Sequence, residues 1–101
     1  MHFSAAIREM KFEYCAKIGT ETIIKIAENC PELRKLAVIR NFNEKSARID
    51  DSCLEVLSQC CPHLEKLELV YSRKFDGMIC QFIGSGGLSN LTYLNLSYCP
   101  V

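Results

Sequence analysis

A spaced run of apolar residues occurs four times along the chain and constrains its fold more than any other feature. Each copy reads apolar, two residues, apolar, one residue, apolar, two residues, then a small polar residue or cysteine. The copies begin at Ile7, Leu33, Leu64 and Leu91, so successive starts are 26, 31 and 27 residues apart. A near-constant period of this length is typical of repeat architectures, in which each repeat is one structural unit.

The centre of each copy predicts a short strand with one buried side. Side chains in a strand alternate between two faces, so the apolar positions share a face and the residue between them points outward. One such strand cannot bury its apolar side alone, whereas stacked copies form a parallel ladder at about 4.8 Å per step over a continuous core. The predicted outward positions in the middle of the strands are Lys11, Ala37, Glu68 and Asn95.

The segments between the strands carry a helical periodicity. The apolar stripe of the first segment consists of Ile23, Ile26, Ala27 and Cys30. The stripe recurs 31 residues later as Leu54, Leu57, Ser58 and Cys61. This spacing of i, i+3, i+4, i+7 predicts amphipathic helices. Thr20 suits an N-cap, and Pro31 ends the first helix because the residue before a proline is pushed out of the helical region.

The repeat spacing is that of leucine-rich repeats, L-x-x-L-x-L-x-x-N/C. We therefore predict an α/β leucine-rich-repeat solenoid, a short horseshoe arc of about four coils. The parallel sheet lies on its concave face and the helices lie on its convex face. Residues 1–101 form a single domain of this kind, with repeats starting near 7, 33, 64 and 91.

Composition narrows the class of protein. The formal net charge is zero, so the chain has no overall attraction to nucleic acid or anionic lipid. Every apolar run is far shorter than the roughly 18 residues that span a bilayer. The first repeat begins at Ile7, which argues against a cleaved targeting peptide. We expect an intracellular protein, cytoplasmic or nuclear, that does not act at a membrane.

The cysteine-containing form of the repeat resembles that of F-box/leucine-rich-repeat proteins. The matching segments are Cys15-Ala-Lys-Ile18-Gly-Thr20 leading to Cys30-Pro31-Glu-Leu33, Ile49-Asp50-Asp51 leading to Cys61-Pro62-His63-Leu64, and, in part, Leu91 to Pro100. The resemblance implies substrate recognition in an SCF-type ubiquitin ligase, whose Skp-family adaptor binds an F-box. An F-box of about forty residues does not fit before Ile7. We therefore expect a fragment or a short stand-alone array, which reaches the adaptor only if an F-box exists upstream.

No catalytic or metal-binding pattern is predicted. A zinc site built from Cys53, Cys60, Cys61 and His63 is disfavoured, because zinc needs four ligands at one point and the adjacent Cys60 and Cys61 point in different directions. A cysteine nucleophile needs a positioned base, and no such base is placed near a thiol. We predict that the protein is not an enzyme and uses no cofactor.

The outward rows of the sheet predict a protein-binding face. The row at the C-terminal ends of the strands holds three tyrosines and an arginine, residue types enriched at binding hot spots. A longer connection, 42–48, follows the second strand and is either a tolerated insertion or a partner-contact loop. The predicted partner-binding residues are Lys11, Glu13, Tyr14, Ile39, Arg40, Phe42, Arg48, Val70, Tyr71, Arg73, Lys74 and Tyr98.

The arginines and lysines at this rim predict an acidic or phosphorylated segment of a protein partner. Three alternatives stay open. The chain could be a small structural or assembly subunit, as in mitochondrial repeat proteins, with no role in ubiquitination. The Tyr/Arg row could bind nucleic acid. The terminal coils have no recognisable polar cap, so the chain could self-associate through its ends.

The cysteines generate a first testable prediction. Seven is an odd number, and a secreted disulfide framework favours an even one, so we expect seven reduced thiols. Titration of the unfolded protein with a thiol reagent should count seven free groups. Dithiothreitol should leave the thermal midpoint unchanged, and a large fall would instead show structural disulfides.

Overall fold

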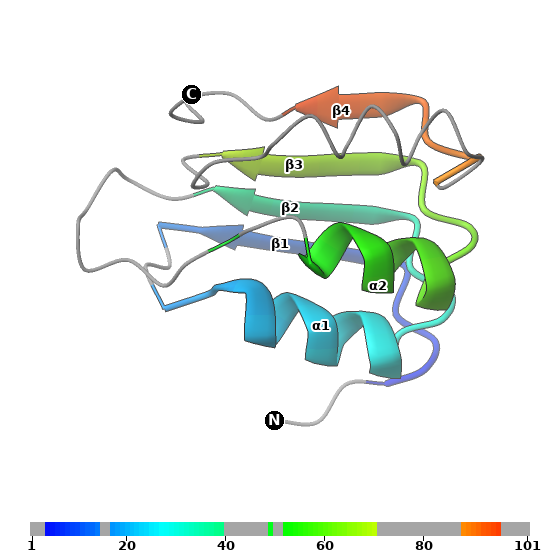
Figure 1. The fold of residues 1–101 in the computed structure, drawn as a ribbon, viewed down its shortest axis with the longest axis horizontal. Helices are drawn as coiled ribbons and strands as arrows, with labels where there is room; N and C mark the ends of the chain where they lie inside the picture. The colour runs from blue at the N-terminus through cyan, green and yellow to red at the C-terminus, as the bar shows by residue number, and fades with distance from the viewer. Residues whose placement is uncertain (1–3, 15–16, 40–48, 50–51, 71–87, 96–101) are drawn as a thin grey trace.

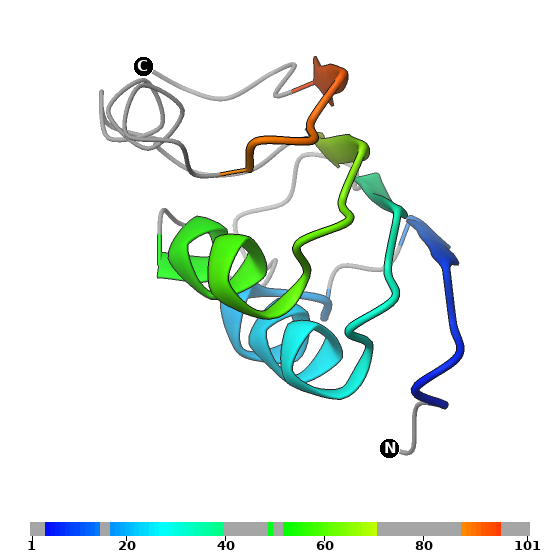
Figure 2. The same ribbon diagram turned by 90° about the vertical axis from the view of Figure 1, so that its right-hand side faces the viewer.

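A parallel four-stranded sheet with two helices on one face forms the described part of the protein, an α/β arrangement (Figures 1 and 2). The computed structural model describes residues 4–14, 17–39, 49, 52–70 and 88–95. The elements are β1 (Glu9–Glu13), α1 (Thr20–Asn29), β2 (Lys35–Ile39), α2 (Ser52–Cys60), β3 (Lys66–Val70) and β4 (Tyr93–Asn95). The strands lie in chain order, β1-β2-β3-β4, and α1 packs against α2.

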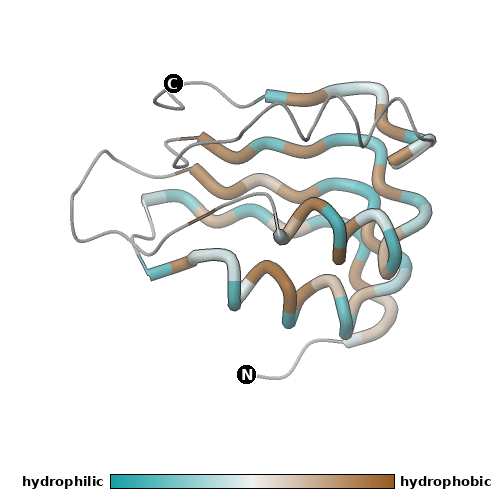
Figure 3. The backbone as a smooth tube through the Cα atoms, viewed as in Figure 1, coloured by the Kyte–Doolittle hydropathy of each residue, from teal (hydrophilic) through white to brown (hydrophobic). Residues whose placement is uncertain are grey.

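The register of the strands is the one that the repeat spacing predicts. One inner row consists of Met10, Leu36, Leu67 and Leu94, each paired with the next across the sheet. Figure 3 shows the resulting alternation of hydrophobic and hydrophilic residues along β3. The predicted outward row of Lys11, Ala37, Glu68 and Asn95 is also in register. Equivalent positions of the repeats therefore become lateral neighbours.

A recurring backbone turn enters each strand. The amide of Leu33 donates to the carbonyl oxygen of Cys30 at 3.2 Å, and the amide of Leu64 donates to that of Cys61 at the same distance. The corresponding bonds before β1 and β4 are Ile7 to Ser4 at 3.1 Å and Leu91 to Leu88 at 2.9 Å. The chain thus enters all four strands through the same local geometry.

The core lies between the sheet and the helices. Ile23, Ile26 and Ala27 on α1 and Leu54 and Leu57 on α2 are buried, as the helical stripes predict. Burial is graded across the sheet, because the central strands have a neighbour on each side. Apolar residues of β2 and β3 in the core are fully buried, whereas Met10 and Phe12 of β1 are only partly buried.

The start of α1 differs from the prediction. The helix begins at Thr20, and Gly19 occupies the N-cap position without a side-chain hydrogen bond to the cap. Gly19 is extended, and its carbonyl oxygen accepts the Ile23 amide at 3.1 Å, which closes the first turn through the backbone. The predicted end of the helix is confirmed, because Asn29 is its last residue and Cys30 follows as the C-cap.

A buried thiol joins successive repeats at the ends of their helices. The last carbonyls of a helix have no partner within it. Cys61 Sγ donates to the carbonyl oxygens of Cys30 at 3.4 Å and Ala27 at 3.6 Å, both at the end of α1. Burial, with smaller contributions from Cys60 and Cys30, raises the pKa of the Cys61 thiol from 9.0 to about 11. The four cysteines in the described part of the chain are thiols, not disulfide partners.

Other predicted features lie outside the described residues, among them the 42–48 connection and the helical segment expected in the third repeat. Among the helices in the described ranges, none is both long enough and apolar enough to cross a membrane.

The inner and outer faces of β3 should respond differently to truncation. Leu67→Ala removes a fully buried side chain between two neighbouring strands. It should therefore lower the free energy of unfolding by about 2–5 kcal/mol. Lys66→Ala, one residue away and exposed, should cost less than about 0.5 kcal/mol in the same urea titration. Equal losses would contradict the assigned faces.

The Cys61 thiol should make stability fall at alkaline pH. The raised pKa means that the unfolded chain releases the proton above pH 9.0, while the folded chain keeps it until about pH 11. The stability that the protonated Cys61 thiol contributes is therefore complete below pH 9.0. It is lost as the pH rises through the pKa of the folded state, about 11. Urea titrations across this range should show a steeper decline for the wild type than for Cys61→Ala. Cys60→Ala, at a half-buried neighbour, is the control and should keep the steep decline.

Candidate binding face of the sheet

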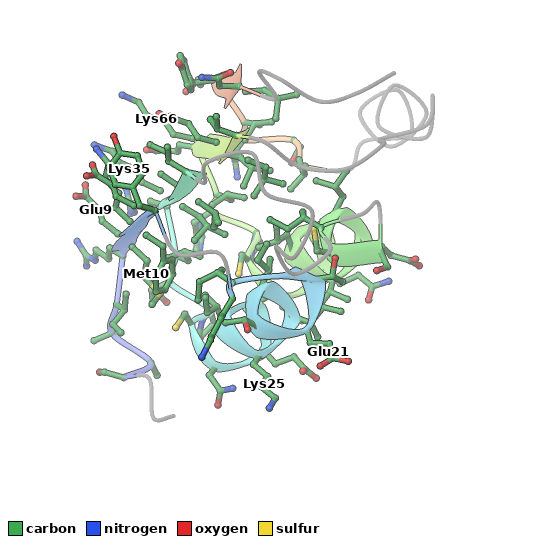
Figure 4. All side chains as sticks on the ribbon, turned by 90° about the vertical axis from the view of Figure 1, so that its left-hand side faces the viewer. Glu9, Met10, Glu21, Lys25, Lys35 and Lys66 are labelled. Carbon is green, nitrogen blue, oxygen red and sulfur yellow. The ribbon has the colours of Figure 1, made fainter. Side chains whose placement is uncertain are left out.

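The face of the sheet that points away from α1 and α2, called here the outer face, is the candidate site. No described element covers it (Figures 1 and 2). In Figure 4 the side chains of Glu9, Lys35 and Lys66 extend on this side, whereas Glu21 and Lys25 lie on the helical side. The same periodicity that buries the inner rows places these polar side chains in solvent.

Three rows of side chains cross the outer face in strict register. The first row consists of Glu9, Lys35, Lys66 and Tyr93. The middle row consists of Lys11, Ala37, Glu68 and Asn95. The third row consists of Glu13, Ile39 and Val70 within the described residues. The face is therefore mainly charged in its first two rows and becomes apolar toward the C-terminal ends of β2 and β3.

Ion pairs link neighbouring charges on this face. Lys35 Nζ lies 3.1 Å from Glu9 Oε1 across two strands, and Lys11 Nζ lies 2.9 Å from Glu13 Oε1 along β1. The Lys11–Glu13 hydrogen bond raises the pKa of the Lys11 ammonium. All four side chains are about half exposed or more, so solvent screens both pairs and they contribute little to the stability of the fold. The main effect of these two ion pairs is to determine which of the described charged side chains of the outer face have no neighbour of opposite charge.

A groove of about 400 Å³ opens over Ala37 on the outer face. The side chains around it are those of Glu9, Lys11, Lys35, Lys66 and Glu68. The methyl group of Ala37 is much shorter than its neighbours in the middle row, and this leaves the hollow. The groove was not among the predicted sites, although a short residue centred among long charged ones in the predicted rows is the signal that locates it.

Some of the predicted partner-binding residues lie on the outer face as expected, Val70 is more buried than expected, and the rest lie outside the described residues. Tyr14 is 68% exposed with φ of 58°, and its amide donates to the Ile39 carbonyl oxygen at 2.7 Å. That bond places an exposed aromatic ring at the C-terminal end of β1. Lys11 and Glu13 are brought together as an ion pair, and Ile39 is half-buried.

Val70 departs from its expected exposure. It occupies the predicted row beside Ile39, but only 8% of its surface is accessible. It does not belong to the central core cluster. Val70 is therefore not an exposed apolar anchor, and the apolar contribution of the third row comes from Ile39.

The other predicted binding residues lie outside the described residues and stay predictions. They are Arg40, Phe42, Arg48, Tyr71, Arg73, Lys74 and Tyr98. Within the described ranges, no group of three or more His, Cys, Asp or Glu side chains is arranged to hold a metal ion.

Comparison with known proteins relates the chain to an F-box protein. No family model and no solved structure matches it. The chain is similar to the F-box protein SKIP1 of Arabidopsis thaliana, with 30% identity over 112 aligned residues. The alignment covers 93% of this chain but 35% of that protein, so the chain spans about a third of the length of this relative. The similarity agrees with the F-box resemblance of the cysteine-containing repeat and extends over most of the chain.

Proposed function

We propose that this chain is a protein-interaction module, a short arc of leucine-rich repeats of the substrate-recognition type found in F-box proteins. The outer face of the sheet binds the partner. The role is recognition, without a catalytic step or a cofactor. The partner is a protein to be ubiquitinated, and recruitment of the ligase adaptor depends on an F-box in the same polypeptide.

The observation that carries this proposal is the uncovered outer face. One side of the sheet is packed by α1 and α2, while the other presents a groove, an exposed tyrosine and ordered rows of charge. A rigid sheet holds these side chains in place before binding, which lowers the entropic cost of association. Exposed tyrosine is also among the residue types that supply most of the energy at protein interfaces.

The repeat architecture is supported by the backbone. The Arg8 carbonyl oxygen accepts the amides of both Arg34 and Lys35, at 2.7 and 3.0 Å. The Arg34 oxygen accepts those of Glu65 and Lys66 at the same two distances, and the Glu65 oxygen accepts those of Thr92 and Tyr93. Three equivalent carbonyls with the same double acceptance are what stacked copies of one structural unit produce.

The link to ubiquitin ligation is supported by the similarity to the F-box protein SKIP1 and by the cysteine-containing repeat. The expected location of the protein is intracellular, where such ligases act. The assembly-subunit alternative has no observation that favours it over recognition.

Site-specific photocrosslinking tests which face binds. Benzoylphenylalanine replaces Lys11 on the outer face in one variant and Glu28 on the outward side of α1 in another. Both native side chains are charged and exposed. Irradiation in cells should give a discrete crosslinked protein from position 11 and none from position 28. A partner captured only from position 28 would place binding on the helices and contradict the proposed face.

The crosslinked protein then tests the biological role. If the module delivers substrates to a ubiquitin ligase, removing the chain should lengthen the half-life of that protein in a cycloheximide chase. Restoring the wild-type chain should shorten the half-life again. An unchanged half-life, together with crosslinking from position 11, would leave the binding face in place and reject the role in ubiquitination.

A further inference from the structure

We propose that the groove over Ala37 accepts an acidic side chain of a protein partner, with the carboxylate bound by Lys66 and flanked by Lys35. This inference rests on the proposed function and adds the chemistry of the segment that contacts the first row. The occupant is an acidic stretch of extended polypeptide.

An unmatched lysine at the edge of the groove is the starting point. Lys35 and Lys66 are direct partners in the parallel register and project on the same face, an arrangement that disfavours two like charges. Glu9 offsets the charge of Lys35 at 3.1 Å. Within the described residues, Lys66 has no ion pair. A carboxylate placed at Lys66 therefore relieves a repulsion that the described residues leave in place.

The charges around the groove orient such an occupant. Glu68 lies two residues beyond Lys66 on the same face of β3 and also lines the hollow. Its charge acts on Lys11 across Ala37 and adds to the larger effect of Glu13 in raising the Lys11 pKa. An incoming carboxylate is repelled near Glu68 and attracted toward Lys35 and Lys66. The lining of the groove therefore carries net positive charge in the first row, where Lys35 and Lys66 outnumber Glu9, whereas Lys11 and Glu68 balance in the middle row.

Space and an aromatic neighbour complete the site. The volume of about 400 Å³ lies within the range of about 300–1,000 Å³ that is typical of ligand pockets. Tyr93 follows Lys66 in the first row and is 45% exposed, so its ring can pack on the aliphatic stem of an acidic side chain. The open face admits an extended chain, whose alternate side chains point into the hollow.

Peptide binding tests the chemistry directly. The probe is fluorescein-labelled Gly-Glu-Gly-Glu-Gly-Glu, and matched peptides carry glutamine or lysine in place of glutamate. Binding to the full 101-residue chain is measured by fluorescence anisotropy. The glutamate peptide should bind most tightly, and more weakly at about 0.15 M salt than at about 0.02 M. Tighter binding of the lysine or glutamine peptide would overturn the inference.

Two matched substitutions distinguish binding of the peptide in the groove from non-specific electrostatic attraction to the protein. Lys66→Gln should weaken binding of the glutamate peptide by about three- to tenfold. Lys25→Gln makes the same change in net charge on α1 and should alter binding by less than about twofold. Equal losses from both variants would show non-specific charge attraction and overturn the inference.

Filling the groove gives an independent readout. Ala37→Leu keeps every charge but occupies the hollow, and should weaken peptide binding while the circular dichroism spectrum is unchanged. If the wild type sediments as a dimer and Ala37→Leu sediments as a monomer, the groove binds a second copy of the chain. That result would overturn the proposal that it binds an acidic segment. Crosslinking from Lys11 with no binding of the glutamate peptide would reject this inference and leave the proposed function standing.

Discussion

The parallel hydrogen-bonded ladder is the constraint on which the rest of the structure depends. The carbonyl oxygens of Arg8, Arg34 and Glu65 each accept two amides from the next repeat, at nearly the same distances in each step. This bonding fixes which residue of one strand lies beside which residue of the next. Because side chains alternate between faces, the same register determines the rows of the core and of the outer face together.

A second layer of contacts transmits this register to the helices. The thiol of Cys61 donates to two carbonyls at the end of α1, so the end of one helix is bound to the residue that follows the next helix. Asn90 provides a comparable link one repeat later, because its side-chain amide donates to the Pro62 carbonyl oxygen at 2.7 Å. The repeats are thus joined at the sheet by backbone groups, and beside the turns that lead into the strands by side chains.

Much of this arrangement follows from local spacing. The inner row through Leu36 and Leu67 and the buried stripe of α1 are as predicted, because periods of two and 3.6 residues specify which side chains share a face. The double role of Cys61 was not predicted. In the sequence pattern a cysteine at this position can serve as a small apolar residue or as a hydrogen-bond donor. Only the location of the α1 carbonyls in the structure shows that the thiol donates.

The outer face shows where such reasoning ends. Its rows are predictable from the spacing, but the burial of Val70 and the hollow over Ala37 are not. The cap of α1 was also misplaced by one residue, because Gly19 and not Thr20 occupies the N-cap position and its backbone carbonyl closes the first turn. Periodicity specifies direction and neighbours, whereas exposure and cavity shape arise from packing in three dimensions.

The spacing of the outer rows limits how a partner can lie on them. Along a strand, side chains on one face repeat every two residues, at about 6.6 Å, while neighbouring strands are about 4.8 Å apart. An extended segment has nearly the same repeat as the strands, so one that runs along them stays in step with the rows through Lys35, Ala37 and Ile39. A segment that crosses the strands falls out of step within two of them. The side chains of the outer face therefore match the repeat of an extended partner only when that partner runs along the strands.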